Sequence, residues 1–124
     1  MQQQVEAKPH VLLVEDEPLV NLMMSEALAE AGFEVCAVAN ATEAMAHLVV
    51  DERFDVMFTD VHMPDMKGTD LARLAHRLQP GMRIVYTSGG VLSAADKLPD
   101  STFVPKPYEP WQVCALLTRV VGRA

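Results

Sequence analysis

The segment from Phe54 to Pro64 constrains the fold more than any other stretch of the sequence. It contains a short apolar run, Val56 to Phe58, which leads to a carboxylate, Asp60. The run is too short for a helix, and its lack of alternation is typical of a strand covered on both faces of a parallel sheet. A charged side chain is costly inside such a strand, and turn residues follow directly. We therefore expect Asp60 at the rim of a sheet.

Other short apolar runs have the same form, and segments with helical periodicity separate them. We expect the remaining strands at residues 11–14, 33–38, 83–87 and 101–104, and helices at 19–31, 41–50, 69–78 and 109–121. Pro18 and Gly32 are typical of the first helix's start and end, and Asn40 with Glu43 has the form of a capping box. Strands that alternate with helices form parallel sheets with right-handed connections. The sequence therefore predicts an α/β fold with five parallel strands.

The segment Val91 to Asp100 has the weakest helical pattern of the chain. Two glycines precede it, Pro99 lies inside it, and few apolar residues are present to form a face. We expect a short, mobile helix there. The eight methionines and Trp111 are expected to pack in the core.

Length and composition favour one domain at residues 10–124, preceded by a polar, disordered lead-in at residues 1–9. Cys36 and Cys114 lie in apolar runs, and the chain shows neither a secretory signal nor an apolar stretch of membrane-spanning length. We therefore expect reduced cysteines and a cytoplasmic location. The net charge of −7, without a basic stripe, argues against direct nucleic-acid binding.

Polar side chains follow the predicted strands at the edge where open parallel sheets bind ligands. Glu15 and Asp16 follow the first strand, Thr87 ends the fourth, and Lys106 follows the fifth. Clustered carboxylates repel one another unless a hard cation lies among them, and oxygen ligands suit Mg²⁺. A lysine and a hydroxyl beside such a metal are typical partners of phosphoryl oxygens. The pattern predicts a magnesium-dependent site at which Asp60 accepts a phosphoryl group.

Other sites are less compatible with the sequence. The glycine-rich patterns GxxxxGK and GxGxxG are both absent, which argues against a nucleotide-binding loop. The four histidines lack the spacing to either cysteine that a zinc site requires.

Four motifs resemble, in order and spacing, the receiver domains of two-component response regulators. They are VLLVEDE at 11–17, VMFTDVHMP at 56–64 with Gly68 following, YTSG at 86–89, and FVPKPY at 103–108. The resemblance covers nearly all of the chain after the lead-in. It implies a flavodoxin-like receiver fold with strand order 2-1-3-4-5 and a short or irregular fourth helix.

The resemblance also implies a role for each polar residue at the rim and for one aromatic residue. By this likeness Asp60 is the phosphoacceptor, and Glu15 and Asp16 are the acidic pair at Mg²⁺. The backbone carbonyl of His62 is a further metal ligand. Thr87 is the hydroxyl that follows the phosphoryl group, Lys106 is the cation that pairs with that group, and Phe103 is the aromatic switch residue.

The function implied is that of a phosphoacceptor in a His-to-Asp phosphorelay, with a histidine kinase or histidine phosphotransfer protein as donor. Signalling then proceeds by protein contact, from a monomer or a weak phosphorylation-dependent dimer. The chain is not expected to be an enzyme beyond self-catalysed phosphoryl transfer and aspartyl-phosphate hydrolysis. The alternative is a binding module of the same fold that no longer cycles phosphate. An aspartate-based phosphatase needs a second acid soon after Asp60. Asp65 is a poor candidate for that acid, because it lies in a turn.

Three features depart from the usual receiver pattern. Glu15 stands where aspartate is commoner, and the bulky His62 is expected to alter the lifetime of the phosphoryl group unless it is simply a surface residue. The weak fourth helix and Gly89–Gly90 resemble receivers that are attached to, or work with, histidine kinases.

Several of the site residues also have a plainer interpretation. Either Asp16 or Glu17 could cap the helix that starts at Pro18. Thr87 could be an ordinary strand end, Lys106 a solvated lysine and Phe103 a core aromatic residue. The joint arrangement carries the hypothesis.

Overall fold

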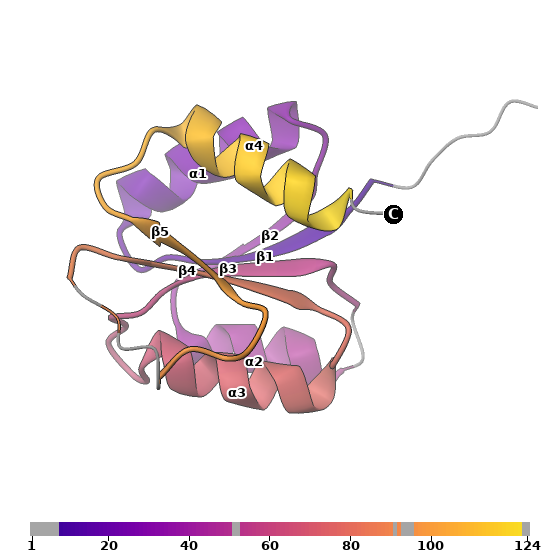
Figure 1. Ribbon diagram of the computed structural model, residues 1–124, viewed down its shortest axis with the longest axis vertical. Coiled ribbons are helices and arrows are strands. Elements are labelled where there is room, and N and C mark those ends of the chain that lie inside the picture. The colour runs from indigo at the N-terminus through magenta and orange to yellow at the C-terminus, as the bar shows by residue number, and fades with distance from the viewer. Residues whose placement is uncertain (1–7, 51–52, 91, 93–95, 123–124) are drawn as a thin grey trace, which may run out of the picture.

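The computed structural model describes residues 8–50, 53–90, 92 and 96–122. Within these residues the chain forms one parallel sheet of five strands in the order β2-β1-β3-β4-β5 (Figure 1). The predicted fold class and strand order are confirmed. The strands are β1 (His10–Val14), β2 (Glu34–Val38), β3 (Val56–Asp60), β4 (Arg83–Ser88) and β5 (Thr102–Pro105). The helices are α1 (Pro18–Glu30), α2 (Ala41–Val49), α3 (Gly68–Leu78) and α4 (Pro110–Val121).

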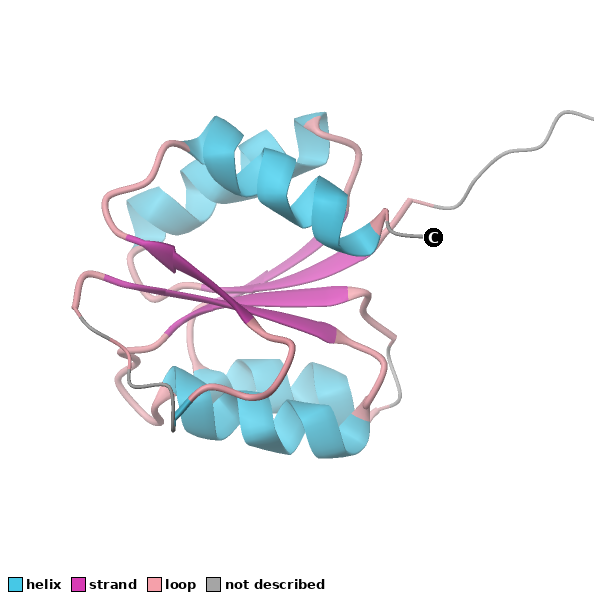
Figure 2. Ribbon diagram, in the orientation of Figure 1, coloured by secondary structure: helices cyan, strands magenta, loops and turns pink. Residues whose placement is uncertain are grey.

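Helices cover both faces of the sheet. Figure 2 shows α1 and α4 on one face and α2 and α3 on the other. Successive side chains of β1 are buried in turn on the two faces: Leu12 packs in the cluster with α2 and α3, and Leu13 packs in the cluster with α1 and α4. Because both faces of the sheet are buried beneath helices, β1 consists of consecutive apolar residues instead of an alternating pattern.

The helix ends follow the local rules that the sequence indicated. Pro18 occupies the first turn of α1, and Gly32 follows the helix with φ of +102°, a value that favours glycine. At α2 the Asn40 side chain accepts a hydrogen bond from the Glu43 N–H at 2.8 Å. The Glu43 carboxylate accepts from Ala39 N–H at 2.9 Å, one residue earlier than in the usual capping box.

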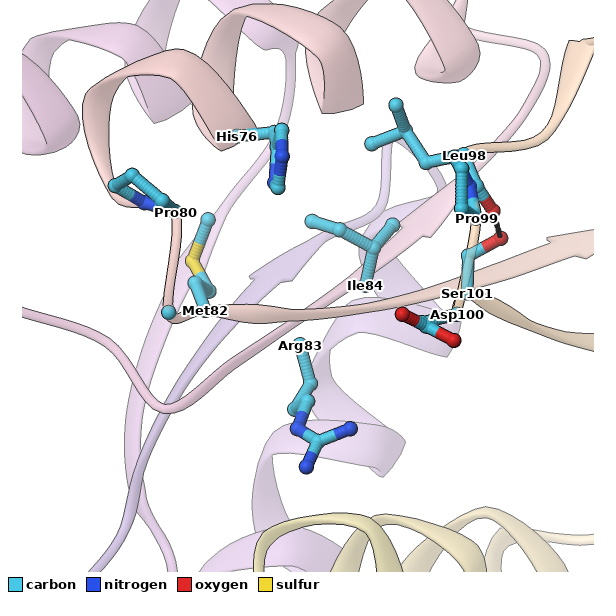
Figure 3. Close-up of a pocket in the computed structure, with 10 residues that line it drawn as sticks. His76, Pro80, Met82, Arg83, Ile84, Leu98, Pro99, Asp100 and Ser101 are labelled. Atoms are coloured by element: carbon cyan, nitrogen blue, oxygen red, sulfur yellow. Dashed lines mark hydrogen bonds between the residues drawn. The ribbon is translucent and has the colours of Figure 1, made fainter.

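Of the short or irregular helix expected between β4 and β5, the described residues show only Asp96, which has 3₁₀-helical geometry. Leu92 and residues 96–100 contain no α-helix, and the remaining positions, 91 and 93–95, lie outside the described residues. The segment is held by contacts, because Leu98 N–H donates to the Tyr86 hydroxyl at 3.2 Å. A pocket of about 360 Å³ lies beside it, between the end of α3 and the start of β4 (Figure 3). A coil segment thus borders this corner of the sheet.

The prediction that Trp111 packs in the core is wrong. Its side chain is 68% exposed, whereas Val113 and Leu117 are fully buried. These two residues are four apart and share one face of α4, and Trp111, two residues before Val113, lies on the other side. The methionines are divided: Met24 is buried and Met23 is exposed.

The proposed lead-in and domain boundary stay predictions, because residues 1–7 lie outside the described range. At its edge, the Pro9 carbonyl accepts from Glu34 N–H at 2.9 Å and so extends the pairing of β1 and β2. Among the described residues, no helix combines the length and apolar character that crossing a membrane requires.

Gly68 tests how tightly α3 is fitted against β3. A Cβ atom at this position would lie 2.1 Å from the Asp60 carbonyl oxygen and 2.9 Å from Val61 Cα, both backbone atoms. We predict that Gly68→Ala lowers the free energy of unfolding by on the order of 3 kcal/mol. Gly81→Ala is the control, since a Cβ there meets no atom within 4 Å, and it should change stability by about 1 kcal/mol or less. Equal urea midpoints for the two variants would contradict the close approach.

Candidate functional site

The register of the sheet aligns the ends of three strands at one rim. Asp60, the last residue of β3, pairs with Thr87 of β4, and Thr87 pairs with Val104 of β5. Paired residues on neighbouring parallel strands point to the same face. Asp60 and Thr87 therefore share a face, and Lys106 follows two residues after Val104.

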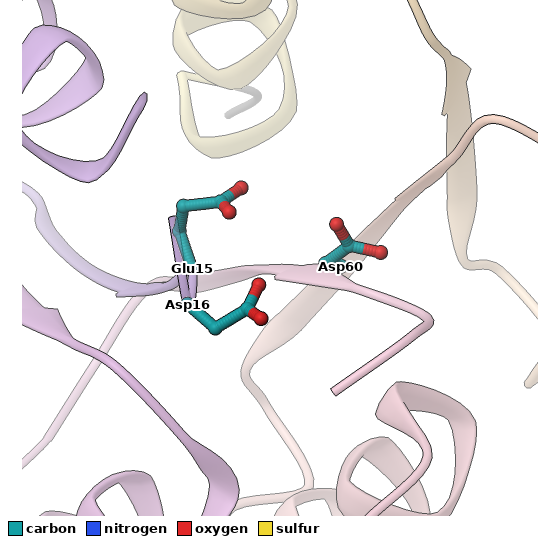
Figure 4. Close-up of side chains that lie close together, drawn as sticks. All are labelled: Glu15, Asp16 and Asp60. Carbon is teal, nitrogen blue, oxygen red and sulfur yellow. The ribbon is translucent and has the colours of Figure 1, made fainter. Parts of the chain in front are cut away.

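Three carboxylates meet at this rim (Figure 4). One oxygen each from Glu15, Asp16 and Asp60 lies within 4.8 Å of the others. The first two residues directly follow β1, and Asp60 ends the neighbouring β3. Glu15 and Asp60 are only 3% and 5% exposed, whereas Asp16 is open to solvent. The predicted acidic cluster is therefore present, with two of its members buried.

One backbone N–H group and one side-chain amide hold the segment that carries Glu15. The Glu17 N–H donates to Glu15 Oε2 at 2.9 Å. The Asn21 amide donates to the carbonyls of Glu15 and Val38 at 3.0 and 3.1 Å, which joins the ends of β1 and β2 to α1. Asn21 is not among the residues predicted from the sequence, because a side chain bonded to backbone carbonyls leaves no sequence motif.

Both oxygens of Asp60 have partners. The His62 N–H donates to Oδ1 at 2.9 Å, and Lys106 Nζ donates to Oδ2 at 2.5 Å. Lys106 itself follows β5, where its N–H donates to the Ser88 carbonyl at 2.9 Å, and a cis peptide bond joins it to Pro107. Lys106 is therefore an ion-pair partner of Asp60 and not merely a solvated lysine.

The pKa values of Glu15 and Lys106 reflect the surplus of negative charge. Burial raises the pKa of Glu15, and although the Glu17 N–H and Lys106 oppose this, the nearby Asp60 and Asp16 add to it. Burial lowers the pKa of Lys106, but its hydrogen bond to Asp60 and the surrounding acids outweigh that effect, so the pKa lies above the ordinary value. The site thus favours bound positive charge.

Thr87 has an unusual environment. Its side chain is 1% exposed, and Oγ1 has no hydrogen-bond partner among the described residues. An unpaired buried hydroxyl costs about 1–3 kcal/mol. A group that tolerates this cost next to Asp60 is available to bind an incoming oxygen atom.

The residues at the rim fit a magnesium ion. The cluster offers carboxylate oxygens only, which suits a hard cation, and its exposed member leaves a side open to solvent. Within the part of the chain that the structure describes, no other group of three or more His, Cys, Asp or Glu side chains brings its ligand atoms close enough together to hold a metal ion.

The other predicted residues lie on the neighbouring segments of the chain. The backbone of His62 is at Asp60 through its N–H, while its side chain is exposed. Phe103 is partly buried against the core on β5, with Lys97 Nζ 5.9 Å from its ring centroid. Glu17 is the N-cap residue of α1 but makes no side-chain cap bond.

Comparison with known proteins identifies this arrangement. The family described as the response regulator receiver domain matches residues 11–118. The chain belongs to this family. As a receiver domain of two-component systems it is a signalling domain, and domains of this kind generally bind Mg²⁺ in an acidic pocket and accept phosphoryl groups from histidine kinases.

Two relatives and one solved structure illustrate the likeness. The response regulator receiver protein CpdR of Brucella abortus is 31% identical over 102 residues, which cover 79% of this chain and 84% of CpdR. The sensor kinase CckA of the same species is 31% identical over 120 residues, 91% of this chain but 12% of CckA. The crystal structure of a receiver protein from Sinorhizobium medicae has a TM-score of 0.86 at 30% identity, covering 93% of this chain and 95% of that one. The chain spans only 11% to 24% of several longer relatives.

The raised pKa of Glu15 predicts how stability depends on pH. The pKa of Glu15 in the folded state lies above its value of 4.5 in the unfolded state. The contribution of this residue to stability is therefore complete below pH 4.5, and it is lost as the pH rises through the folded-state pKa. In EDTA, Glu15→Gln should therefore be more stable than the parent at pH 7, and the difference should vanish near about pH 4. Chemical denaturation at both pH values measures this. A gain that grows in acid would contradict the assignment.

Proposed function

We propose that the chain takes a phosphoryl group on Asp60 from a phosphohistidine of a histidine kinase or histidine phosphotransfer protein, and signals by protein contact. An Asp60 oxygen forms a bond to phosphorus while the bond from phosphorus to the donor's histidine nitrogen breaks, and the electron pair returns to that nitrogen. The observation that carries this proposal is the position of Asp60, a buried carboxylate between an acidic pair and the ammonium of Lys106.

The residues around Asp60 have separate tasks in this proposal. Glu15, Asp16, Asp60 and the His62 carbonyl would hold Mg²⁺. The bound ion supplies positive charge that lessens repulsion between the carboxylates and the incoming phosphoryl oxygens. Lys106 Nζ, which donates a hydrogen bond to Oδ2 of Asp60, exchanges that bond for one to a phosphoryl oxygen. The Thr87 hydroxyl, which has no partner among the described residues, donates a hydrogen bond to another phosphoryl oxygen. This contact distinguishes the phosphorylated state from the free one.

The surface that α1 presents beside the rim supports a protein donor, because Leu22 lines a pocket with Glu15 and Asp16, and Met23 lines one with Lys106. Leu19, Leu22 and Met23 of α1 are 69%, 54% and 48% exposed. Met23 also lines a mainly apolar groove of about 610 Å³ whose other wall includes Lys106 and Pro107. The groove is continuous with the site through Lys106, and exposed apolar side chains of this size favour protein contact. We assign it to the donor's histidine-bearing element.

The cysteines support a reducing compartment. Cys36 and Cys114 are partly buried thiols, and the pKa of Cys114 is raised by burial and by Glu30. A raised pKa lowers the fraction of reactive thiolate. We propose that the protein acts in the cytoplasm.

Removal of the nucleophile tests the phosphoacceptor. Asp60→Asn should abolish phosphate uptake from acetyl phosphate with Mg²⁺, because an amide is far less nucleophilic than a carboxylate of the same shape. Intact-mass spectrometry measures the added phosphate, and circular dichroism checks that the fold is kept. Uptake equal to that of the parent would reject Asp60. A fully folded parent that never incorporates phosphate would favour the alternative, a binding module of the same fold.

Magnesium binding tests the acidic pair. Binding to the folded state alone raises stability by about 1.4 kcal/mol when Mg²⁺ is present at ten times its Kd. Asp16→Ala should abolish most of this rise in thermal denaturation, because it removes an exposed carboxylate from the cluster. If the variant gains as much as the parent from Mg²⁺, the metal assignment is wrong.

The donor surface is tested by comparing phosphoryl transfer from a protein donor with transfer from a small molecule. Leu22→Asp should slow transfer from a histidine kinase that phosphorylates the parent by about tenfold or more, because a charge replaces an apolar contact. Uptake from acetyl phosphate should stay unchanged. The matched control is Val49→Asp on α2, which is 59% exposed and belongs to the opposite helical layer. Equal rates for the two variants with the kinase would contradict this docking face.

A further inference from the structure

The loop from Val61 to Lys67 links the proposed phosphoacceptor to α3 and carries His62. It is fixed near both ends by backbone contacts. The His62 N–H donates to Asp60 Oδ1 at 2.9 Å, and the Gly68 N–H donates to the Val61 carbonyl at 2.7 Å. Any displacement of this loop would therefore be felt at the Asp60 carboxylate.

Asp65, in the second half of this loop, binds the start of α2. Its Oδ1 accepts from the Ala41 N–H at 3.1 Å. Its Oδ2 accepts from the Thr42 N–H at 2.9 Å and from the Thr42 hydroxyl at 2.6 Å. The bond from the Thr42 hydroxyl is the main cause that holds the pKa of Asp65 below its ordinary value. Both oxygens of one carboxylate thus connect segments more than twenty residues apart, as the sequence separations of 23 and 24 record.

The Asp65 bonds do more than cap a helix. The first four N–H groups of a helix lack partners within it, and Asn40 already supplies the local cap by accepting from the Glu43 N–H at 2.8 Å. Asp65 takes the N–H groups of the two residues before Glu43. The start of α2 therefore serves as an anchor for a loop that comes from another part of the chain.

Among the described residues, no other hydrogen bond to a distant segment orients this loop between its ends. Met63 and Met66, on either side of Asp65, are partly buried against the core. Methionine side chains are flexible and adapt to many positions, so their packing does not define the orientation of the backbone. Hydrogen bonds to both oxygens of a planar carboxylate define position and direction together.

We propose that Asp65 is a positioning residue that clamps the loop to α2 and thereby sets the backbone of His62 for Mg²⁺. This inference rests on the proposed function, in which the His62 carbonyl is a metal ligand. Asp65 lies three residues after His62 and does not itself belong to the acidic cluster. Its effect on the metal is exerted through the loop.

The test compares two variants that weaken the same helix end. Asp65→Ala removes the clamp, whereas Asn40→Ala removes the local cap of α2 and leaves the loop contacts in place. Groups that orient metal ligands contribute about 10- to 100-fold to metal affinity, so we expect Asp65→Ala to weaken Mg²⁺ binding by about tenfold in calorimetric titration. Asn40→Ala should bind Mg²⁺ within about twofold of the parent although it is less stable. Equal losses of Mg²⁺ affinity in the two variants would overturn the proposal.

Two further measurements separate the clamp from charge and from general stability. Asp65→Asn removes the charge but keeps one acceptor oxygen, so it should retain more affinity than Asp65→Ala; an affinity equal to that of Asp65→Ala would overturn the clamp. Amide exchange of His62 should accelerate in Asp65→Ala and not in Asn40→Ala, since only the former frees the loop. If Asp65→Ala does not fold, Thr42→Val, which removes the 2.6 Å bond alone, replaces it and should weaken binding in the same direction.

The outcomes distinguish this inference from the proposed function. A parent protein that does not bind Mg²⁺ would overturn the proposed function and the clamp together. A parent that binds Mg²⁺, with Asp65→Ala equal to it, would overturn the clamp alone.

Discussion

Burial of the sheet on both faces is the constraint from which the rest of the structure follows. Leu12, Val56 and Met57 are completely buried in strands between two helical layers. A charge in these positions would have to leave water without compensation, at a cost of several kcal/mol. Polar side chains are therefore restricted to the strand ends, and because all strands are parallel, their carboxyl ends meet at one rim. The same packing that stabilises the domain concentrates its chemistry.

The concentration of acids at that rim is energetically unfavourable in the absence of a cation. The pKa of Glu15 is raised by burial and the pKa of Lys106 is raised by Asp60, so both shifts favour added positive charge. Lys106 offsets part of the repulsion through its bond to Asp60. In the proposed reaction Lys106 exchanges this contact for a phosphoryl oxygen. Its side chain is about one third exposed and can move, and the phosphoryl group gained by the buried Asp60 keeps the ammonium paired with negative charge.

Two buried hydroxyls near the site have no partner among the described residues, Thr87 Oγ1 and the Tyr108 phenol. Burial raises the pKa of Tyr108 to about 12, with Glu15 and Asp60 adding to the shift, so the phenol stays neutral beside the acids. Its ring packs edge-on against Phe58 at 5.8 Å and thereby joins the loop after β5 to the centre of the sheet. Thr87 stands beside Asp60 in register and Tyr108 follows two residues after Lys106, so both unpaired groups border the rim. Unpaired groups of this kind are tolerated where binding later satisfies them.

The sequence by itself determined the local structure and the identity of the residues at the rim. Apolar runs, helical spacing, Pro18, Gly32 and the Asn40–Glu43 pair act within a few residues, and the structure agrees with each of them within about two residues. The strand order came from the likeness to receiver domains, not from periodicity. Trp111 was placed incorrectly because a helical pattern identifies an apolar residue without saying which face the tertiary structure covers.

Only the tertiary structure decided how distant segments meet. Lys106 reaches Asp60 across 46 residues, and Asp65 reaches α2 across 23. The close approach of Gly68 to the Asp60 carbonyl and the missing partner of Thr87 are likewise properties of packing. These contacts depend on strand register and on how closely the helical layers approach the sheet. A single sequence does not encode either of them as a local pattern, because they arise only when elements far apart in the chain are packed together.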